Sequence, residues 1–477
     1  MALTFKGGVQ IGIRKKAANK EIEDFTPSRV FLPFTEDCTL KVGDEVALGQ
    51  PIGEDALGVL WHASIAGKVA EIKELGGKRY LAIEADGSGR EEKPLQPADK
   101  PLSAFSAQEI IETVRLAGIF GMGGGKSTAE KLTSAVGRVE RIIVNCAESE
   151  PYSSADHRTL VEKPEEVVNG AKILMRALSV ARAYIAIEDD KLDAASAVDA
   201  VNGQSELVRV RIMKSKYPQG SEKMLISAII GKELPAGRSP EELGCFVVNC
   251  RTCAAVYRAF AYGEVMTRVT LTVSGGAVKR SRNLCVPLGA PLSDTVHYAG
   301  GVRASSLIIG GAMNGRSAVE LDEPILSGAA VLCLSARYRA PEQFACVRCG
   351  RCADACPMRL VPSFLYKACV KNDQKKADKL NISSCIECGA CAFICPARLP
   401  ILEKIREMKS IPVTESQIPA EASEALAEVS EIPAEVSEIP AEVSETPAEV
   451  SETPADVSEV PAAEEETEKE DTKNAEA

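Results

Sequence analysis

The chain is poor in histidine and in aromatic residues, and it contains no long apolar run. Its 477 residues include three His, one Trp and 4% aromatic side chains in total. Because so few histidines are present, neither a zinc site built from histidines nor a Ser-His-Asp or Cys-His catalytic arrangement is expected. No stretch of about 18 apolar residues is present, so no membrane-spanning helix is expected. The first 14 residues lack the continuous apolar segment of a secretory signal, which indicates a cytoplasmic setting.

The formal net charge of −12 is unevenly distributed along the chain. Residues 411–477 carry 20 acidic side chains against two lysines, a net charge of −18, whereas the preceding 410 residues have a net charge of +6. This last segment repeats PAEVSEI with small variations and places a proline in every repeat. Proline at that spacing excludes a continuous helix, and the low hydrophobicity and high charge predict a disordered acidic tail.

Two cysteine runs, CVRCGRCADACP and CIECGACAFICP, share the spacing C-x₂-C-x₂-C-x₃-C-P. This is the bacterial ferredoxin spacing for two 4Fe-4S clusters, and neither a zinc site nor a disulfide framework explains eight cysteines at matched spacing. The fourth cysteine of each run is expected to bind the cluster of the other run. The predicted ligand sets are Cys346, Cys349, Cys352 and Cys395 for one cluster, and Cys385, Cys388, Cys391 and Cys356 for the other. Helices are predicted around 362–371 and 399–408, flanking the cluster loops.

The front of the chain has the pattern of a β-rich carrier domain. Short strands punctuated by glycine, LKVGDEVALGQPIGED and WHASIAGKVAEIKEL, resemble the barrel-sandwich fold of biotinyl and lipoyl domains. Carrier domains present a modifiable lysine at the hairpin tip, but here the tip holds His62, Ala63 and Ser64. We therefore expect the fold without its prosthetic group, with His62 in surface or turn packing.

From Pro101 onwards, apolar strands and helices alternate. Ser106 and Glu109 form a capping-box pattern, and Gly118 can end that helix in a left-handed conformation. Strands are predicted at 141–145, 183–187 and 207–212, and helices at 164–178, 192–201 and 221–230, which implies a parallel sheet covered by helices. The predicted domains are a barrel-sandwich domain (1–100), an α/β domain (101–265), a β-grasp module (266–338), a double 4Fe-4S ferredoxin domain (339–410) and the tail (411–477).

A glycine loop, GMGGGKSTAEKL, is the first candidate ligand-binding feature. Four glycines in five residues allow close backbone approach to a phosphate, although a tight structural turn would use them equally well. A Walker P-loop is excluded because the position that needs glycine is Phe120. Polar residues follow the strand at 141–145 and recur in KYPQGSEK and FVVNCRTC, at the sheet edge where α/β proteins bind ligands. The candidate binding residues are Gly121, Gly123, Gly124, Gly125, Lys131, Asn145, Glu148, Glu150, Tyr217, Gly220, Glu222, Asn249 and Thr252.

The order of these motifs resembles the C subunit of Rnf-type ion-translocating ferredoxin:NAD oxidoreductases, which is related to the flavoprotein subunit of respiratory complex I. The resemblance covers about residues 1–410 and rests on the front domain, the glycine loop, N-x-AE-x-EPY…ADHR, YPQGSEK and the double cysteine run. It implies a multidomain α/β protein whose Rossmann-like domain binds FMN, with two 4Fe-4S clusters and NADH as substrate. The loop here lacks the Phe-Pro of the family's usual GLGGAGFPTHVKL, which predicts weaker nicotinamide binding.

The resemblance also implies an oxidoreductase subunit held peripherally on the cytoplasmic side of the cell membrane. Its expected partners are membrane-embedded and flavin-carrying subunits of the same complex and ferredoxin or NADH, with no nucleic acid. Three alternatives remain open: a cobalamin-reducing flavoprotein of bacterial microcompartments, a soluble flavin subunit of an NADH dehydrogenase or hydrogenase, and a scaffold that keeps only the clusters.

Overall fold

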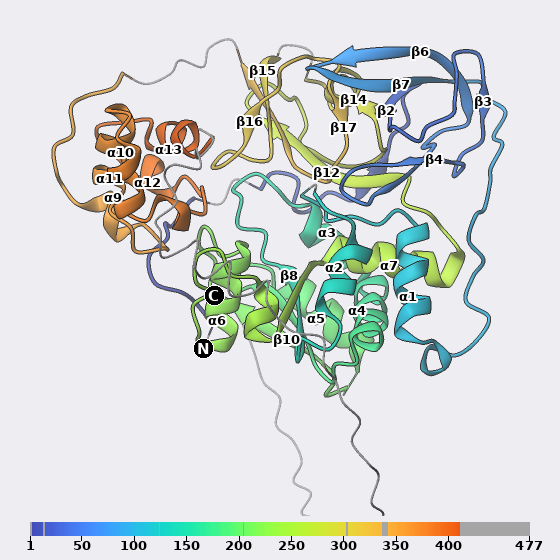
Figure 1. Cartoon of the computed structure of the whole chain (residues 1–477), viewed down its shortest axis with the longest axis horizontal. Helices are drawn as coiled ribbons and strands as arrows, with labels where there is room; N and C mark the ends of the chain where they lie inside the picture. Colours follow the sequence, from blue (N-terminus) through green and yellow to red (C-terminus); the bar gives the residue numbers. More distant parts are fainter. Residues whose placement is uncertain are drawn as a thin grey trace, which may run out of the picture. The chain divides into compact units, whose positions relative to one another are not determined.

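The computed structural model describes residues 2–12, 15–123, 125–203, 205–301, 304–335 and 342–410 (Figure 1). The acidic repeat and Gly124 of the glycine loop lie outside these residues, so the expected disorder of the tail stays a prediction. No helix within the described ranges is long and apolar enough to span a lipid bilayer.

The segment that alternates strands and helices forms a four-stranded sheet of order β10-β9-β8-β11, and every neighbouring pair in it is parallel. Three of the four strands were predicted from the apolar pattern, with bounds that differ by at most one residue at each end. The strands are β8 (Arg141–Cys146), β9 (Ala183–Glu188), β10 (Val208–Met213) and β11 (Cys245–Asn249).

Helices cover both faces of this sheet because side chains on each strand alternate between two cores. Ile142 and Val144 belong to the main core, whereas Ile143 packs with Leu225 in a second core. The predicted helices are present as α4 (Pro164–Leu178), α5 (Leu192–Asn202) and α6 (Glu222–Ile230). The same domain also contains α3 (Ala155–Glu162) and α7 (Cys250–Tyr262).

Two helices flank the glycine loop. Helix α1 (Ala107–Leu116) begins with the predicted capping box of Ser106 and Glu109, and Gly118 follows it with φ of 65°. Helix α2 (Thr128–Ala135) begins at Ser127, whose side chain accepts a hydrogen bond from the backbone of Ala129. The loop is therefore held at both ends by capped helices.

The front domain contains a sheet of order β2-β7-β6-β3 and a separate β4-β5 pair. The expected hairpin tip is buried: His62 is 1% exposed, and the Ser64 hydroxyl donates a 2.5 Å hydrogen bond to the Leu288 carbonyl. A buried tip cannot present a swinging prosthetic group, in agreement with the loss of the modifiable lysine. The strands are β2 (Arg29–Pro33), β3 (Glu45–Val46), β4 (Pro51–Glu54), β5 (Leu60–His62), β6 (Gly67–Leu75) and β7 (Lys78–Ala85).

A six-stranded mixed sheet follows, in the order β1-β13-β12-β18-β15-β16. A hairpin of β12 and β13 leads into helix α8 (Leu292–Tyr298), and β12 then pairs in parallel with the last strand, β18. Strand β1, from the front of the chain, adds a parallel edge to β13 that the sequence pattern did not predict. The strands are β1 (Ile22–Asp24), β12 (Arg268–Gly275), β13 (Arg282–Pro287), β15 (Ala304–Ile309), β16 (Arg316–Ser317) and β18 (Val331–Ser335), beside a small β14 (Ala290–Pro291) and β17 (Pro324–Ile325) pair.

The cysteine-rich segment is a helical module with its own core (Figure 1, orange). Its two long helices were predicted at 362–371 and 399–408 and lie within two residues of those bounds. The helices are α9 (Arg351–Asp354), α10 (Pro362–Val370), α11 (Gln374–Lys379), α12 (Ala390–Phe393) and α13 (Ile401–Lys409).

The first residues of the chain connect this module to the α/β domain. Leu3 forms two backbone hydrogen bonds with residues at the end of β10, as the donor in one and as the acceptor in the other. Val9 and Tyr217 form two backbone hydrogen bonds with each other, of 2.8 and 3.0 Å. Gly8 then donates to the carbonyl of Ala355 in the cysteine-rich module. This short extended segment therefore ties the carboxyl edge of the sheet to the cysteines.

Candidate functional site

A cavity of about 530 Å³ opens at the carboxyl ends of β8 and β11, where parallel sheets place ligands. Its wall combines strand ends, the glycine loop, the loop before α6 and the cysteine-rich module. Seven of the predicted binding residues line it: Gly123, Asn145, Glu148, Glu150, Tyr217, Gly220 and Asn249.

The two asparagines at the strand ends organise the floor of this cavity. Asn145 donates from Nδ2 to the carbonyl of Gly220 at 2.8 Å, which holds the loop before α6 against β8. Asn249 caps α7 by accepting from the Arg251 backbone at 2.9 Å, and its Nδ2 lies 3.1 Å from both carboxylate oxygens of Asp156. Both amides thus fix backbone at the cavity wall.

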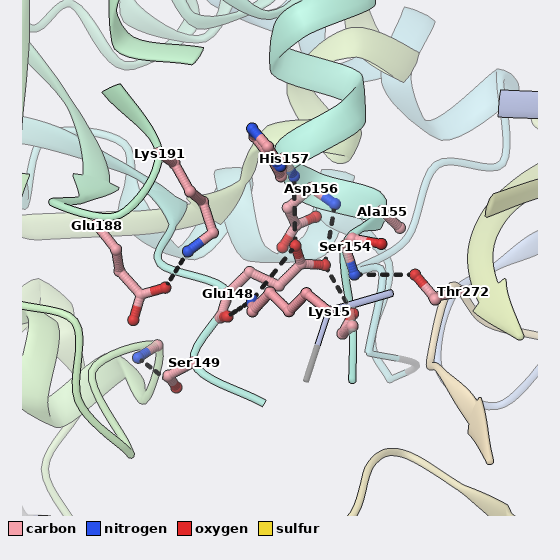
Figure 2. Close-up of polar contacts among 12 residues, drawn as sticks. Lys15, Glu148, Ser149, Ser154, Ala155, Asp156, His157, Glu188, Lys191 and Thr272 are labelled. Atoms are coloured by element: carbon pink, nitrogen blue, oxygen red, sulfur yellow. Dashed lines mark hydrogen bonds and ion pairs between the residues drawn. The ribbon is translucent and has the colours of Figure 1, made fainter. Parts of the chain in front are cut away.

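Glu148 is buried, and both of its carboxylate oxygens accept hydrogen bonds from the chain itself (Figure 2). One oxygen accepts from the Ser153 hydroxyl at 2.6 Å and the Asp156 backbone at 3.1 Å, and the other accepts from the His157 backbone at 3.4 Å. The carboxylate therefore caps the start of α3, whose own N-cap residue Ser154 makes no side-chain cap. The sequence predicted that Glu148 reaches a ligand, but its oxygens are occupied in this way.

Buried charges surround this cap. Lys15 donates to the Glu148 carbonyl and lies 3.9 Å from its carboxylate, and burial lowers the pKa of this lysine (Figure 2). Arg251, which the sequence analysis missed, pairs with Asp156 at 2.6 Å and also lines the cavity. Removing one member of such a pair would strand a charge in the interior, so the network fixes the cavity wall.

Glu150 has a different environment from Glu148. One oxygen accepts from the backbone of Met313 at 3.2 Å, and the other is buried without a hydrogen-bond partner among the described residues. Burial raises the pKa of this carboxyl to about 7, although backbone N–H groups of the loop at 312–314 oppose the shift. Glu150 is thus the lining residue with unused hydrogen-bonding capacity.

Tyr217 connects the cavity to the cysteines. This residue is 3% exposed, and its hydroxyl donates a 2.6 Å hydrogen bond to the backbone carbonyl of Cys388. Burial and the neighbouring Glu150 raise the pKa of the phenol, so it stays protonated. Ile386 and Cys388 themselves form part of the cavity wall.

The remaining candidates lie elsewhere. Lys131, one of the predicted binding residues, donates to the Val247 carbonyl at 2.7 Å and pairs with Glu222 at 3.4 Å. Neither Lys131 nor Glu222 lines the cavity. Gly121 and Thr252 are also absent from the wall, and Gly125 lines a neighbouring cavity of about 580 Å³. Gly124 lies outside the described residues.

Several wall residues escaped the sequence analysis because only the fold brings them together. Ser149 accepts from the backbone of Gly220 at 3.1 Å, and the β15–β16 and β17–β18 loops contribute Asn314 and Gly328. Ser149 and Ser153 could have been suspected, since they lie within the segment that follows β8. Asn314 and Gly328 carry no local signal.

The eight cysteines of the two runs surround two separate cavities. Among the described residues, no three metal-ligating side chains converge closely enough for a single ion. The wider cavity is instead lined by the first three cysteines of the first run and the last cysteine of the second run. The narrower cavity is lined by the first three cysteines of the second run and the last cysteine of the first run. The first contains Cys346, Cys349, Cys352 and Cys395, and the second contains Cys356, Cys385, Cys388 and Cys391.

The second set of cysteines is the more enclosed. Backbone N–H groups of Leu360 and Glu387 donate to the sulfurs of Cys356 and Cys385, each at 3.4 Å. Burial raises the pKa of the Cys388 thiol to about 12. Such N–H···S bonds and burial are the means by which a protein adjusts an iron–sulfur centre.

Three family models match the chain. They are a Nuo51 FMN-binding domain over residues 114–258, a 4Fe-4S dicluster domain over 341–396, and an RnfC barrel sandwich hybrid domain over 3–84. The class of protein is thus a flavin and iron–sulfur electron carrier, which confirms the predicted FMN-binding and 4Fe-4S domains. The parts of the chain that these models cover are those that form the sheet, the cysteine module and the front strands.

Curated relatives narrow this class. The chain is 36% identical to the C subunit of the proton-translocating ferredoxin:NAD(+) oxidoreductase complex of Clostridium ljungdahlii, over 76% of this chain and 84% of that protein. It is 34% identical to the Na(+)-translocating counterpart of Acetobacterium woodii, over 79% and 90%, and 33% identical to the C subunit of the ion-translocating oxidoreductase complex of Haemophilus influenzae, over 85% and 52%. The chain belongs to the family of C subunits of ion-translocating ferredoxin:NAD(+) oxidoreductase complexes. The predicted family is confirmed, and these relatives do not favour the microcompartment or soluble-dehydrogenase alternatives.

Proposed function

We propose that this chain is the peripheral electron-transfer subunit of an ion-translocating oxidoreductase complex and exchanges electrons between NADH and partner subunits through FMN and two 4Fe-4S clusters. It would lie on the cytoplasmic side of the membrane, against membrane-embedded and flavin-carrying subunits. Ferredoxin is the second electron partner of the complex. The observation that carries the proposal is that Cys388 belongs both to the wall of the large cavity and to a four-cysteine site.

The cavity is suited to FMN in size and in chemistry. Its volume of about 530 Å³ falls in the range that holds cofactor-sized ligands. A β-carbon placed at Gly123 would meet no atom within 4 Å, so the loop leaves open space for close backbone approach. Glu150 retains an unpartnered oxygen at the wall. When bound, FMN supplies the conversion between a hydride donor and one-electron carriers.

The residues of this chain have positioning roles in that scheme. Asn145 and Asn249 fix the strand ends, Glu148 fixes α3, and Tyr217 fixes the backbone of Cys388 against the cavity. Rigid placement matters because electron transfer depends on a constant separation between carriers. Gly121, Gly125, Lys131, Glu222 and Thr252 would support the cavity from outside rather than line it, and Gly124 belongs to the loop that approaches the phosphate.

The eight cysteines are proposed to bind two clusters with crossed ligation, since each cavity draws three cysteines from one run and one from the other. The site at Cys388 would be nearer the flavin, and the site at Cys349 would be nearer solvent, where Cys349 is exposed. Electrons would therefore pass between the flavin and the Cys388 site, and then between the two clusters.

The domain boundaries stay as proposed at 1–100, 101–265, 266–338, 339–410 and 411–477. A hairpin, one helix and a parallel pairing of the first and last strands support a β-grasp fold for the third domain. The acidic tail would be a solubilising tether.

Cofactor content tests the proposal. Anaerobically purified full-length protein should release about one flavin per chain on acid extraction and contain about eight irons. Purified protein that contained iron but no flavin would contradict the flavin assignment and would favour a scaffold that keeps only the clusters.

A further inference from the structure

The cysteine module is a repeat in which each position has a counterpart 39 residues later, as Cys346 has in Cys385. The backbone repeats as well: Arg348 and Glu387 both have φ of 54°, and Gly350 and Gly389 have φ of 79° and 77°. The module therefore presents the same face twice, once at each four-cysteine site.

The face of the second half is covered by the α/β domain. Ile386 and Cys388 line the flavin cavity, and the Tyr217 hydroxyl donates to the Cys388 carbonyl. Glu387, between them, pairs with Arg406 at 3.2 Å and with Lys409 at 2.5 Å. What covers this face is thus a redox domain of the same chain.

Within the part of the chain that the structure describes, nothing covers the matching face of the first half. Cys349, the counterpart of Cys388, is exposed, and Val347, the counterpart of Ile386, is 66% exposed. Phe364 is 52% exposed on α10 beside them, and both Val347 and Phe364 line the cysteine site. Large exposed apolar side chains gathered at one place on a protein surface indicate an interaction site.

Three basic side chains lie on this face or next to it in the chain. Arg348, Arg351 and Lys367 are exposed, and none of them has a carboxylate partner within the described ranges. The second half has Glu387 at the position of Arg348 and Glu403 at the position of Phe364. The first half therefore differs from the covered half in having Arg348 and Phe364 where the covered half has two glutamates.

We propose that this face, made by Val347, Arg348, Cys349, Phe364 and Lys367, docks a one-electron carrier protein whose contact surface has carboxylates around an apolar centre. The inference rests on the proposed function, because the docked carrier would exchange electrons with the cluster at Cys349. One electron would pass from a reduced cluster held by these cysteines to the oxidised carrier, or in the opposite direction, with no bond or proton exchanged. Complementary charge would speed encounter and orient the carrier.

Charge reversal on this face tests the proposal. Arg348→Glu and Phe364→Glu each introduce the residue that the second half has at the matching position. Because the second half folds with these glutamates, both variants are expected to fold. Lys375→Glu, on exposed α11 and outside the cysteine site, is the matched control. The full-length protein with both clusters is reduced photochemically and mixed by stopped flow with an acidic flavodoxin or with a basic c-type cytochrome.

For both test variants, the second-order rate constant with the flavodoxin should fall about tenfold at low ionic strength, and the rate constant with the cytochrome should rise. Added salt should shrink both effects, and Lys375→Glu should change neither rate constant comparably. Unchanged rates, or equal changes in the control, would overturn the proposal. Self-association of the wild-type chain that Arg348→Glu abolishes in sedimentation would also overturn it, by showing that the face contacts a second copy.

Two features keep the test decisive. If Arg348→Glu loses iron, Phe364→Glu on the surface of α10 answers the same question without touching the cysteine loop. Photochemical reduction does not require the flavin cavity or NADH, so a failure of docking and a failure of the flavin assignment give separate results.

Discussion

The hydroxyl of Tyr217 donates a 2.6 Å hydrogen bond to the backbone carbonyl of Cys388. One residue comes from the loop before α6 in the α/β domain, and the other is a cysteine of the second run. The bond therefore fixes the wall shared by the cavity and the cysteine site, and a change at Tyr217 should affect both.

Tyr217→Phe should lower the free energy of unfolding by about 1–3 kcal/mol, because it leaves the buried Cys388 carbonyl without its partner. Iron content should stay unchanged, while the midpoint potential of one cluster should shift as its backbone relaxes. Chemical denaturation and an EPR-monitored redox titration measure the two effects. Tyr298→Phe is the control, since Tyr298 is 39% exposed; equal effects in both variants would show that the Tyr217 bond has no special role.

Gly123→Val should fold normally and lose flavin. A β-carbon at Gly123 meets no atom within 4 Å, so the branched side chain projects into open space and not into the protein. Flavin extraction, iron analysis and thermal melting separate the outcomes. Gly276→Val is the matched control, because Gly276 also has open space around its β-carbon position and lies in the turn after β12. Retention of flavin by Gly123→Val would place the cofactor elsewhere.

Cys356→Ala should damage the cluster of the Cys385 run, although Cys356 belongs to the first run. This follows from the cavity that Cys356 shares with Cys385, Cys388 and Cys391. EPR spectra of the reduced variant should lose the signal that Cys388→Ala also removes. Loss of the signal removed by Cys346→Ala would contradict crossed ligation. Cys369→Ser, in the module core but outside both cavities, should keep all its iron.

The part of the fold that local pattern could predict is the part with strong periodicity. Strand β8 and helix α4 were predicted almost to the residue, because apolar spacing and a Pro at the start of α4 mark their bounds. The site was harder to predict, because a carboxylate that follows a strand can bind a ligand or can form hydrogen bonds within the protein itself. Glu148 caps α3, and Lys131 pairs with Glu222, because the fold places a helix start and a counter-charge beside them. No sequence pattern reveals such neighbours.

The stability of the front domain should depend on pH through His62. Burial lowers the pKa of this imidazole from 6.5 to about 4, partly offset by the nearby carbonyls of Leu60 and Leu116. The unfolded chain therefore takes up a proton first as the pH falls below about 6.5, and stability present above that pH is lost toward pH 4, by about 1.4 kcal/mol at pH 5.5.

Fluorescence of Trp61, the single tryptophan and a neighbour of His62 in β5, reports this loss during denaturation. His62→Leu should remove this loss of stability between pH 6.5 and pH 4, whereas His297→Gln, at an exposed site, should retain it. The wild type and His62→Leu must be compared because burial also raises the pKa of Glu150. That shift makes the protein less stable as the pH rises, which is opposite in sign to the effect of His62. Equal pH dependence in wild type and His62→Leu would refute the role of His62.

Electron transfer between the cavity and the clusters is tested most directly by running it from the cysteine module toward the nucleotide. Flavin-loaded protein is reduced with a limiting low-potential reductant, freed of excess, and mixed with a high concentration of NAD⁺ under anaerobic conditions. Wild-type protein should form NADH as the cluster EPR signals disappear, and Gly123→Val, with its clusters reduced to the same extent, should form none. NADH formation at equal rates in both proteins, or none in the flavin-loaded wild type, would contradict electron transfer through this cavity.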